Sequence, residues 1–538
     1  MKYRLLAIFA LLVPFFSVAQ ERGLDEKVND AFMPIATWWE GFILTPITIA
    51  GYDLPIVLLL LIFGATFFTI YFKFPNIYRF PLAINTVRGK YDELDHHGVE
   101  KANVNIVDGD LVDTIMDESK DGEVSHFQAL ATAVSGTVGL GNIAGVAVAI
   151  AVGGPGATFW MIVCGLIGMS TKFVECTLGV KYRDVDENGV VYGGPMYYLS
   201  RGLKERGFTR IGKVLAVTFA ILCVGASFGG GNAFQSNQAA VQISSMLSLE
   251  GGATGIIIGV ILAILVGIVI IGGIKKIASV TEKIVPFMAG VYVLASLVII
   301  FANIEYIGDA FSMIISGAFT PLAGLGGVMG VIIVGFQRAA FSNEAGAGSA
   351  AIAHSAVKTK YPASEGVVAL LEPFIDTVVI CTMTALVIIF FNMDAGAFDY
   401  GNSVNSTVLI NETGNYVGGV DLTSMAYDSV IPGFRYILTI AIILFAFSTM
   451  ISWSYYGLQS WKFLFGRGNI ADVVYKILFL LFVVIGAAAT LDAVIKFSDA
   501  MILALVFPNM IGLLFLFPKV RDEMNRYVTD IKGFVKSK

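Results

Sequence analysis

The sequence predicts an all-α membrane protein that crosses the bilayer eleven times, with its last ten spans arranged as two five-helix repeats of opposite orientation. The first observation is composition: of 538 residues, 56% are hydrophobic and 14% are charged, with a mean hydropathy of +0.77, far more apolar than a soluble protein. The second is the recurrence of apolar segments of roughly 20 residues, the length that crosses the hydrocarbon core. The third is a matched pair of glycine-rich interruptions inside two of those segments.

The N-terminus has the pattern of a secretory signal at residues 1–19. Lys2 and Arg4 precede an apolar run that ends in small residues before Gln20, which predicts cleavage there. An uncleaved extra helix is the alternative. Residues 20–53 are predicted to be a periplasmic, interfacial segment, because they gather aromatic side chains that favour the membrane-water boundary.

Eleven apolar segments along the chain are long enough to cross the bilayer. They lie at residues 54–72, 127–152, 157–180, 213–246, 254–272, 284–301, 322–345, 366–391, 431–456, 470–487 and 491–517. The first is an added helix, and the other ten form two repeats, at 126–301 and 322–517. The remaining segments are predicted to be a cytoplasmic loop at 73–125, a periplasmic connection at 302–321, a periplasmic loop at 392–430 and a cytoplasmic tail at 518–538.

Lysine and arginine mark one side of the membrane. Alternate loops contain them, among others Arg79, Lys181, Lys275, Lys358 and Lys462, whereas the loops in between contain neither residue. Because basic loops stay in the cytoplasm, this bias predicts a bacterial inner-membrane protein with a periplasmic N-terminus and a cytoplasmic C-terminus. The net charge of −6 is a property of the loops, so membrane lipid is expected around the spans and no nucleic acid is expected as a partner.

The span at 127–152 contains the stretch SGTVGLGNIAG at 135–145. Four glycines together with Ser, Thr and Asn have low helix propensity and disfavour a continuous helix. Free carbonyls at membrane depth must meet a cavity, water or an ion, so the stretch predicts an unwound segment that lines a site. Close helix packing through small residues is the alternative, and Gly141 with Gly145 would satisfy it.

The span at 322–345 ends in a similar stretch, FSNEAGAGS at 341–349, in which Gly346 and Gly348 match Gly139 and Gly141. The two interruptions are separated by five spans. Because five is odd, the two repeats run in opposite senses across the membrane. Paired broken helices in inverted repeats mark the substrate and ion site of secondary transporters, near the bilayer midplane.

A family resemblance, carried by these breaks and by the motifs given next, implies an amino-acid zwitterion as the substrate, and the two breaks supply the chemistry that such a molecule needs. Half-helix ends offer N–H groups for its carboxylate and carbonyls for its ammonium, and glycines let a small substrate approach the backbone. The substrate-binding candidates at the breaks are therefore Thr137, Gly139, Gly141, Asn142, Phe336, Phe341, Ser342 and Asn343.

These motifs resemble the alanine or glycine:cation symporter family, the sodium:alanine symporters. The resemblance rests on both breaks, on GGPGATFWM at 153–161 and on GGPMYY at 193–198, and it extends from about residue 122 to 517. Ile162 departs from the family pattern, which has a second Trp there. The family is similar to LeuT-type transporters, whose ten core helices would be the second to eleventh spans. The resemblance implies symport of alanine or glycine with Na⁺.

The resemblance also adds residues outside the breaks to the site. Gln235 lies among several amides inside the span at 213–246; hydrogen bonding between helices explains such amides equally well, but the resemblance implies a substrate contact. Trp453 lies one helical turn after Thr449 on the same face and would close the pocket.

The sodium ligands implied by the resemblance are Ser448 and Thr449, with backbone carbonyls near Ser135 and Val138. Hydroxyl oxygens are hard ligands of the type that suits Na⁺. The alternative is that both hydroxyls bond to their own helix backbone.

Ionisable residues within spans are functional hypotheses by default. Structural or gating pairs are predicted among residues that stand close in sequence, namely Arg338 with Glu344, Lys172 with Glu175, and Glu372 with Asp376. If Glu372 or Asp376 faces the pocket, proton coupling gains support. His126 lies at the membrane edge and is predicted to be structural rather than a proton relay.

The function that these observations predict is secondary active import of a small neutral amino acid, alanine or glycine, coupled to Na⁺ by alternating access. A proton-coupled or broader amino-acid carrier on the same fold is the alternative. Paired inverted breaks argue against a channel, and the chain has no nucleophile elbow, zinc-protease motif or nucleotide loop, so no enzyme is predicted. The four cysteines lie in apolar stretches as packing residues. The sequence carries no signal for an oligomeric state.

Overall fold

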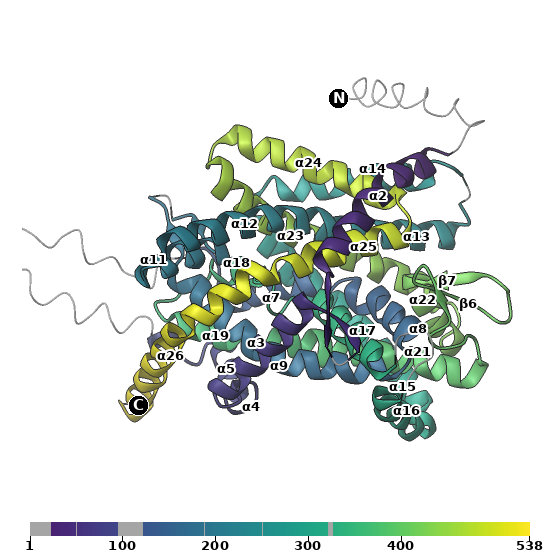
Figure 1. Cartoon of the computed structure of the whole chain (residues 1–538), viewed down its shortest axis with the longest axis horizontal. Helices are drawn as coiled ribbons and strands as arrows, with labels where there is room; N and C mark the ends of the chain where they lie inside the picture. Colours follow the sequence, from purple (N-terminus) through teal and green to yellow (C-terminus); the bar gives the residue numbers. More distant parts are fainter. Residues whose placement is uncertain are drawn as a thin grey trace, which may run out of the picture.

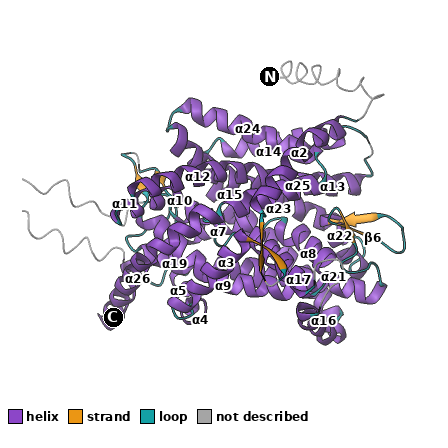
Figure 2. Ribbon diagram, viewed as in Figure 1, coloured by secondary structure: helices purple, strands orange, loops and turns teal. Residues whose placement is uncertain are grey.

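The computed structural model describes residues 23–49, 51–94, 122–187, 189–249, 251–320 and 327–537. Within these ranges the chain is built of helices, and its short strands are confined to loops (Figure 2). The predicted all-α class is therefore confirmed. The signal predicted at 1–19 and much of the loop predicted at 73–125 lie outside the described residues.

The first repeat contains a broken helix followed by long helices. Its elements are α7 (His126–Thr137), η3 (Gly141–Gly145), α8 (Val146–Gly153), α9 (Gly156–Lys181), α12 (Thr209–Phe228), η5 (Gly229–Ala233), α13 (Phe234–Leu247), α14 (Thr254–Ile270) and α15 (Gly273–Ala302). Between α9 and α12, the loop forms β3 (Asp184–Val185), β4 (Val191–Tyr192), α10 (Pro195–Tyr197), η4 (Tyr198–Gly202) and α11 (Leu203–Glu205).

The second repeat follows the same order. Its elements are α17 (Val328–Asn343), α18 (Ala350–His354), α19 (Pro362–Ala369), α20 (Leu371–Pro373), η7 (Phe374–Cys381), α21 (Thr382–Ala395), α23 (Phe434–Phe465), α24 (Asn469–Ala488), α25 (Leu491–Ala504) and α26 (Val506–Ser537). Within the predicted tail at 518–538, residues 518–537 continue α26 as helix.

Seven helices in the described ranges are long and apolar enough to cross a membrane, and an eighth appears if α7 and the helix at Gly141–Gly153 are counted as one bent span. Three shorter apolar helices, α3 (Ile56–Tyr71), α14 and α17, lie where further spans are predicted. The total of eleven spans stays a prediction.

The first break separates α7 from α8 with a bend of 49°. A capping box fixes the start of α7, because the Ser125 hydroxyl accepts the Gln128 N–H and the Gln128 side chain accepts the Ser125 N–H. The chain leaves the α-helix after Thr137 and resumes through the π-helical turn η3. A glycine-rich stretch therefore interrupts the helix where the sequence predicts it.

The second break lies between α17 and α18 and has a different backbone cause. Glu344, Gly346 and Gly348 have φ angles of 55°, 95° and 83°, in the left-handed region that ends a right-handed helix. A Cβ at Gly348 would lie 2.8 Å from both Asn509 and Pro195. Glycine is thus required there for both conformation and space.

The two breaks face each other in the core of the molecule. α17 packs against α8 and η3, while α18 packs against α7 and α9. Each half-helix thus lies beside a half-helix of the other repeat, as inverted repeats require. Figure 1 shows α7, α17 and α18 near the centre of the bundle, with α24 at its upper edge and α16 at its lower edge.

The loop predicted at 392–430 is more than a connection. It forms the sheet β5–β6–β7 (Ser403–Val404, Thr407–Leu409 and Tyr416–Gly418) and the helix α22 (Gly419–Val430). The Thr423 hydroxyl donates to the Ile143 carbonyl at 3.1 Å, and the Val420 N–H donates to Gln238 at 2.9 Å. The segment predicted as a periplasmic loop therefore contains regular structure, and through Thr423 its helix α22 supplies a hydrogen-bond donor to the first break. The connection at 302–321 likewise contains η6 (Ile304–Tyr306) and α16 (Ile307–Phe319).

The segment before the first span forms α2 (Leu24–Ile43) and the hairpin β1–β2 (Pro46–Ile49 and Tyr52–Pro55). α2 packs on α25, with the rings of Phe32 and Phe497 5.0 Å apart, and Figure 1 shows the two helices crossing. After α3, two short helices follow, α4 (Pro75–Tyr78) and α5 (Phe80–Val87).

Apolar side chains cover the outside of the bundle. On α14, Ile257, Ile261, Ile264 and Ile268 are 41%, 54%, 58% and 58% exposed. Such a row of exposed isoleucines is disfavoured in water and suits hydrocarbon.

Candidate functional site

A backbone carbonyl at the end of α7 meets hydroxyl groups from α23. The Thr449 hydroxyl donates to the Ser135 carbonyl at 3.0 Å, and the Ser135 hydroxyl donates to the Ser448 carbonyl at 2.8 Å. The Ser452 hydroxyl also donates to the Ser135 hydroxyl at 3.0 Å. α23 therefore holds the end of the first half-helix at several points, where carbonyls lose their helical partners.

Although Ser448 and Thr449 are adjacent in sequence, their hydroxyl groups bond to different partners. The Ser448 hydroxyl donates to Phe445 of its own helix at 3.0 Å and faces the Met288 sulfur. Thr449 instead points at the break. The helix-bonded alternative for this pair thus holds for Ser448 but not for Thr449.

The glycines of the first break admit neighbours close to the backbone. A Cβ at Gly139 would lie 2.3 Å from the Thr449 hydroxyl and 3.2 Å from the Gln235 carbonyl oxygen. The same Gln235 oxygen accepts the Leu140 N–H at 3.1 Å. Gln235 and Thr449 therefore both lie against the first break.

Aromatic rings close the sides of this region. The Phe341 ring lies 3.4 Å from the Cβ position of Gly141 and packs edge-on against Phe234, with centroids 5.0 Å apart. Trp453 lies against Gly231, where a Cβ would overlap it, at 2.1 Å. Phe336 lies farther out, beside Trp160 at 6.2 Å, so among the predicted aromatic residues it has the weakest link to the breaks.

Asp376 connects the two breaks. Its Oδ1 accepts the Asn142 amide at 2.6 Å, and its Oδ2 accepts the Ser342 hydroxyl at 2.8 Å and the Thr377 hydroxyl at 2.7 Å. The carboxylate is fully buried. Asn142 also accepts the Gly139 N–H at 2.9 Å, so one acidic side chain organises polar residues of both broken helices.

The side chains of two further predicted site residues, Thr137 and Asn343, donate hydrogen bonds to groups outside the first break's contacts with Gln235 and Thr449. The Thr137 hydroxyl bonds to Ala133 of its own helix at 3.2 Å, and the Asn343 amide bonds to Thr377 at 2.9 Å. Asn232 and Asn237 donate to carbonyls of α24 and of the residue after it. For these two amides, hydrogen bonding between helices is confirmed.

The predicted pairing of charged residues was wrong in its partners. Lys172 forms its ion pair with Glu372 at 3.0 Å, and Arg338 pairs with Asp499 of α25. Side chains on different helices meet where tertiary packing brings them, whatever their distance in sequence. The Arg338 guanidinium also lies 5.5 Å from the centre of the Phe341 ring, so the Arg338–Asp499 pair covers one side of the site.

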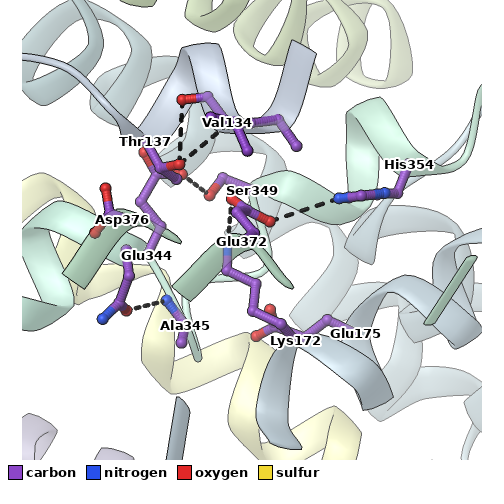
Figure 3. Close-up of polar contacts among 12 residues, drawn as sticks. Val134, Thr137, Lys172, Glu175, Glu344, Ala345, Ser349, His354, Glu372 and Asp376 are labelled. Atoms are coloured by element: carbon purple, nitrogen blue, oxygen red, sulfur yellow. Dashed lines mark hydrogen bonds and ion pairs between the residues drawn. The ribbon is translucent and has the colours of Figure 1, made fainter. Parts of the chain in front are cut away.

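The sequence interpretation missed two buried ionisable residues, Glu365 and His354. His126 contacts Glu365, which also contacts His354; His354 therefore lies close behind the second break, which the prediction did not foresee. Glu175 accepts the Gly346 N–H at 2.9 Å and the Asn509 amide at 2.7 Å. For His354, the available signal in the sequence was its position a few residues after Gly346 and Gly348. Figure 3 shows Glu344, Glu372, Lys172 and His354 around the second break.

Known proteins resemble this chain over most of its length. A model of the sodium:alanine symporter family matches residues 41–537. The sodium/alanine symporter AgcS of Methanococcus maripaludis is 40% identical over 474 residues, which are 88% of this chain and 94% of that protein. The probable sodium/glutamine symporter GlnT of Bacillus subtilis is 32% identical over 76% of this chain and 80% of that protein. The sodium/proton-dependent alanine carrier protein of Bacillus sp. strain PS3 is 31% identical over 78% of this chain and 91% of that protein.

Proposed function

Because this chain belongs to the sodium:alanine symporter family, we propose that it imports alanine or glycine together with Na⁺. Membership makes the chain a multi-pass membrane protein that performs cation-coupled amino-acid symport, and a transporter rather than an enzyme. The LeuT-type fold class agrees with this membership. The identity of the ion and of the amino acid forms the proposal.

The observation that carries the sodium assignment is the contact of Thr449 with the Ser135 carbonyl at 3.0 Å. A small rotation of the hydroxyl would direct both oxygens at one cation, and hard oxygen ligands are the type that suits Na⁺. The proposed ligands are Ser448, Thr449 and carbonyls near Ser135 and Val138. Among these, Thr449 has the strongest structural support, since its oxygen already lies at the break.

The crowding at the glycines supports a small substrate. Phe341 lies 3.4 Å from the Cβ position of Gly141, and Trp453 fills the space beside Gly231. A substrate that reaches the backbone of the first break must fit between these rings, which favours the methyl of alanine or the hydrogen of glycine over the longer side chain of glutamine. Thr137, Gly139, Asn142, Gln235, Phe336, Ser342 and Asn343 complete the proposed set.

The proposed location is a bacterial inner membrane, with the N-terminus periplasmic and the C-terminus cytoplasmic. The separation of lysine and arginine into alternate loops supports this orientation. The isoleucine row on α14 supports contact with lipid.

The test compares Thr449→Ala and Ser448→Ala in proteoliposomes, by measuring labelled-alanine uptake against Na⁺ concentration. We expect Thr449→Ala to raise the half-saturating Na⁺ concentration more than Ser448→Ala, because the Ser448 hydroxyl bonds to its own helix. Ser454→Ala is the matched control, since that buried hydroxyl bonds to Ile451 of the same helix at 2.7 Å. An unchanged Na⁺ dependence in both Thr449→Ala and Ser448→Ala would remove this ion site.

A further inference from the structure

Trp453, an aromatic wall of the proposed pocket, is held by a polar contact as well as by packing. Its ring lies on η5, where a Cβ at Gly231 would be only 2.1 Å away, and Tyr456 packs edge-on against it, with ring centroids 5.3 Å apart. Its indole N–H donates to Oε1 of Glu344 at 3.0 Å. Because an indole has a single N–H and accepts no hydrogen bond, this contact fixes the direction in which the edge of the ring points.

Glu344 occupies a backbone position that favours glycine. It ends α17 with a φ angle of 55°, and Gly346 and Gly348 follow at 95° and 83°. A left-handed conformation is costly for a residue with a Cβ, and such a residue persists where the surrounding structure or the function requires it. The chain has glycine at two of these three left-handed positions and a long acidic side chain at the third. This substitution pattern indicates a role for the Glu344 side chain that glycine cannot supply.

The two carboxylate oxygens of Glu344 have different partners. Oε2 accepts the hydroxyl of Ser349, five residues later, and Figure 3 shows both side chains at the second break. That bond braces the turn between α17 and α18, and it would be sufficient for a purely structural role. Oε1 reaches another element, α23, through the indole of Trp453. Because this second bond has no part in the turn, it links the second break to the wall of the pocket.

The orientation of the Trp453 ring sets the space that is left beside the breaks. Phe341 lies 3.2 Å from the Cβ position of Gly230, and Trp453 covers the next residue, Gly231. The two rings thus lie on adjacent glycines of η5 and together limit the volume available to a substrate side chain. A buried N–H without an acceptor is costly. Without the carboxylate of Glu344, the indole therefore favours other orientations, and the limit on volume is relaxed.

We propose that Glu344 is a positioning residue that sets the size limit of the substrate side chain by fixing the orientation of Trp453. In this role the carboxylate acts through the indole and not through contact with the substrate. The inference rests on the proposed import of alanine or glycine, and it names the residue that keeps larger amino acids out. It does not depend on the identity of the coupled ion.

The test measures how well the reconstituted protein discriminates between alanine and 2-aminobutyrate, which is one methylene longer. Each unlabelled amino acid competes with labelled alanine for uptake, and the readout is the ratio of the two half-inhibitory concentrations. Since one methylene in an apolar pocket is worth roughly 10- to 200-fold in discrimination, we expect Glu344→Ala to lower the wild-type ratio about tenfold. Glu344→Gln should keep the ratio, because its amide oxygen accepts the indole N–H and its NH₂ group donates to Ser349.

A double-mutant cycle separates this role from a structural one. Trp453→Phe removes the N–H, so the addition of Glu344→Ala to that variant should change the ratio no further. The matched control is Asp530→Ala, because that carboxylate accepts the Tyr361 hydroxyl at 3.0 Å near the C-terminal end of α26, and it should keep the wild-type ratio. A structural effect of Glu344→Ala would raise both half-inhibitory concentrations equally or lower the amount of folded protein, and neither changes the ratio.

A wild-type ratio in Glu344→Ala overturns the inference and leaves alanine import intact. A further fall when Glu344→Ala is added to Trp453→Phe also overturns it, because Glu344 then acts on the pocket by another route. Wild-type protein that takes up neither alanine nor glycine refutes the proposed function itself.

If Glu344→Ala fails to fold, Glu344→Asp replaces it. The aspartate carboxylate stands ~1.5 Å farther from the indole, beyond hydrogen-bond distance. The same fall in the ratio is therefore expected, and an unchanged ratio in Glu344→Asp overturns the inference.

Discussion

Replacing Gly139 by alanine tests whether the first break must admit the Thr449 hydroxyl. The added Cβ would lie 2.3 Å from that oxygen, about 1 Å short of ordinary contact. The hydroxyl must move away from the break, or the break must open. Overpacking of this kind costs about 1–3 kcal/mol. If that cost falls on ion binding, the half-saturating Na⁺ concentration rises roughly 5- to 150-fold.

The assay is labelled-alanine uptake by reconstituted protein across a range of Na⁺ concentrations. Gly145→Ala is the matched control, because it lies in the same interrupted segment and its Cβ meets no heavy atom within 4 Å beyond its own helix backbone. We expect the control to stay near the wild-type value. A wild-type Na⁺ dependence in Gly139→Ala would refute the placement of Thr449 at the ion site.

Two further predictions address the carboxylate between the breaks and the helix α22. Asp376→Asn loses one of the two carboxylate oxygens that accept the Asn142 and Ser342 donors, at a cost of about 1–3 kcal/mol. The affinity for alanine, measured by equilibrium binding, should therefore fall roughly 5- to 150-fold. An unchanged affinity would show that the two breaks do not depend on this bridge. Burial raises the pKa of Asp421 to about 6, against a smaller lowering effect of a hydrogen bond from Ser245. Its protonated form is thus favoured by folding, and this contribution is lost as the pH rises through 6. The melting temperature of Asp421→Asn should therefore exceed that of the wild type at pH 7 by more than at pH 5, and a difference independent of pH would contradict the assignment.

The positions of the breaks were predictable because their causes are local. Glycines at 139 and 141, and at 346 and 348, weaken a helix wherever it packs, and positive φ angles at Gly346 and Gly348 are open mainly to glycine. The matching spacing then identified the pair as the centre of an inverted repeat.

The partners of the charged residues were not predictable, because they depend on packing between distant segments. Lys172 has Glu175 one turn away on its own helix, yet it pairs with Glu372 from α20. Adjacent residues on a helix also point about 100° apart, so the sequence alone could not separate Thr449, which reaches Ser135, from Ser448, which does not. The contact of α22 with the first break was not predictable either, because it also depends on packing between distant segments.

The most direct test of sodium-coupled symport is the accumulation of labelled alanine by the reconstituted protein under an imposed Na⁺ gradient, with a K⁺ gradient of equal size as the comparison. The account predicts accumulation above the external concentration with Na⁺, rising about tenfold for each tenfold of gradient per Na⁺ carried, and none with K⁺. Accumulation that is equal under Na⁺ and K⁺ gradients would contradict it.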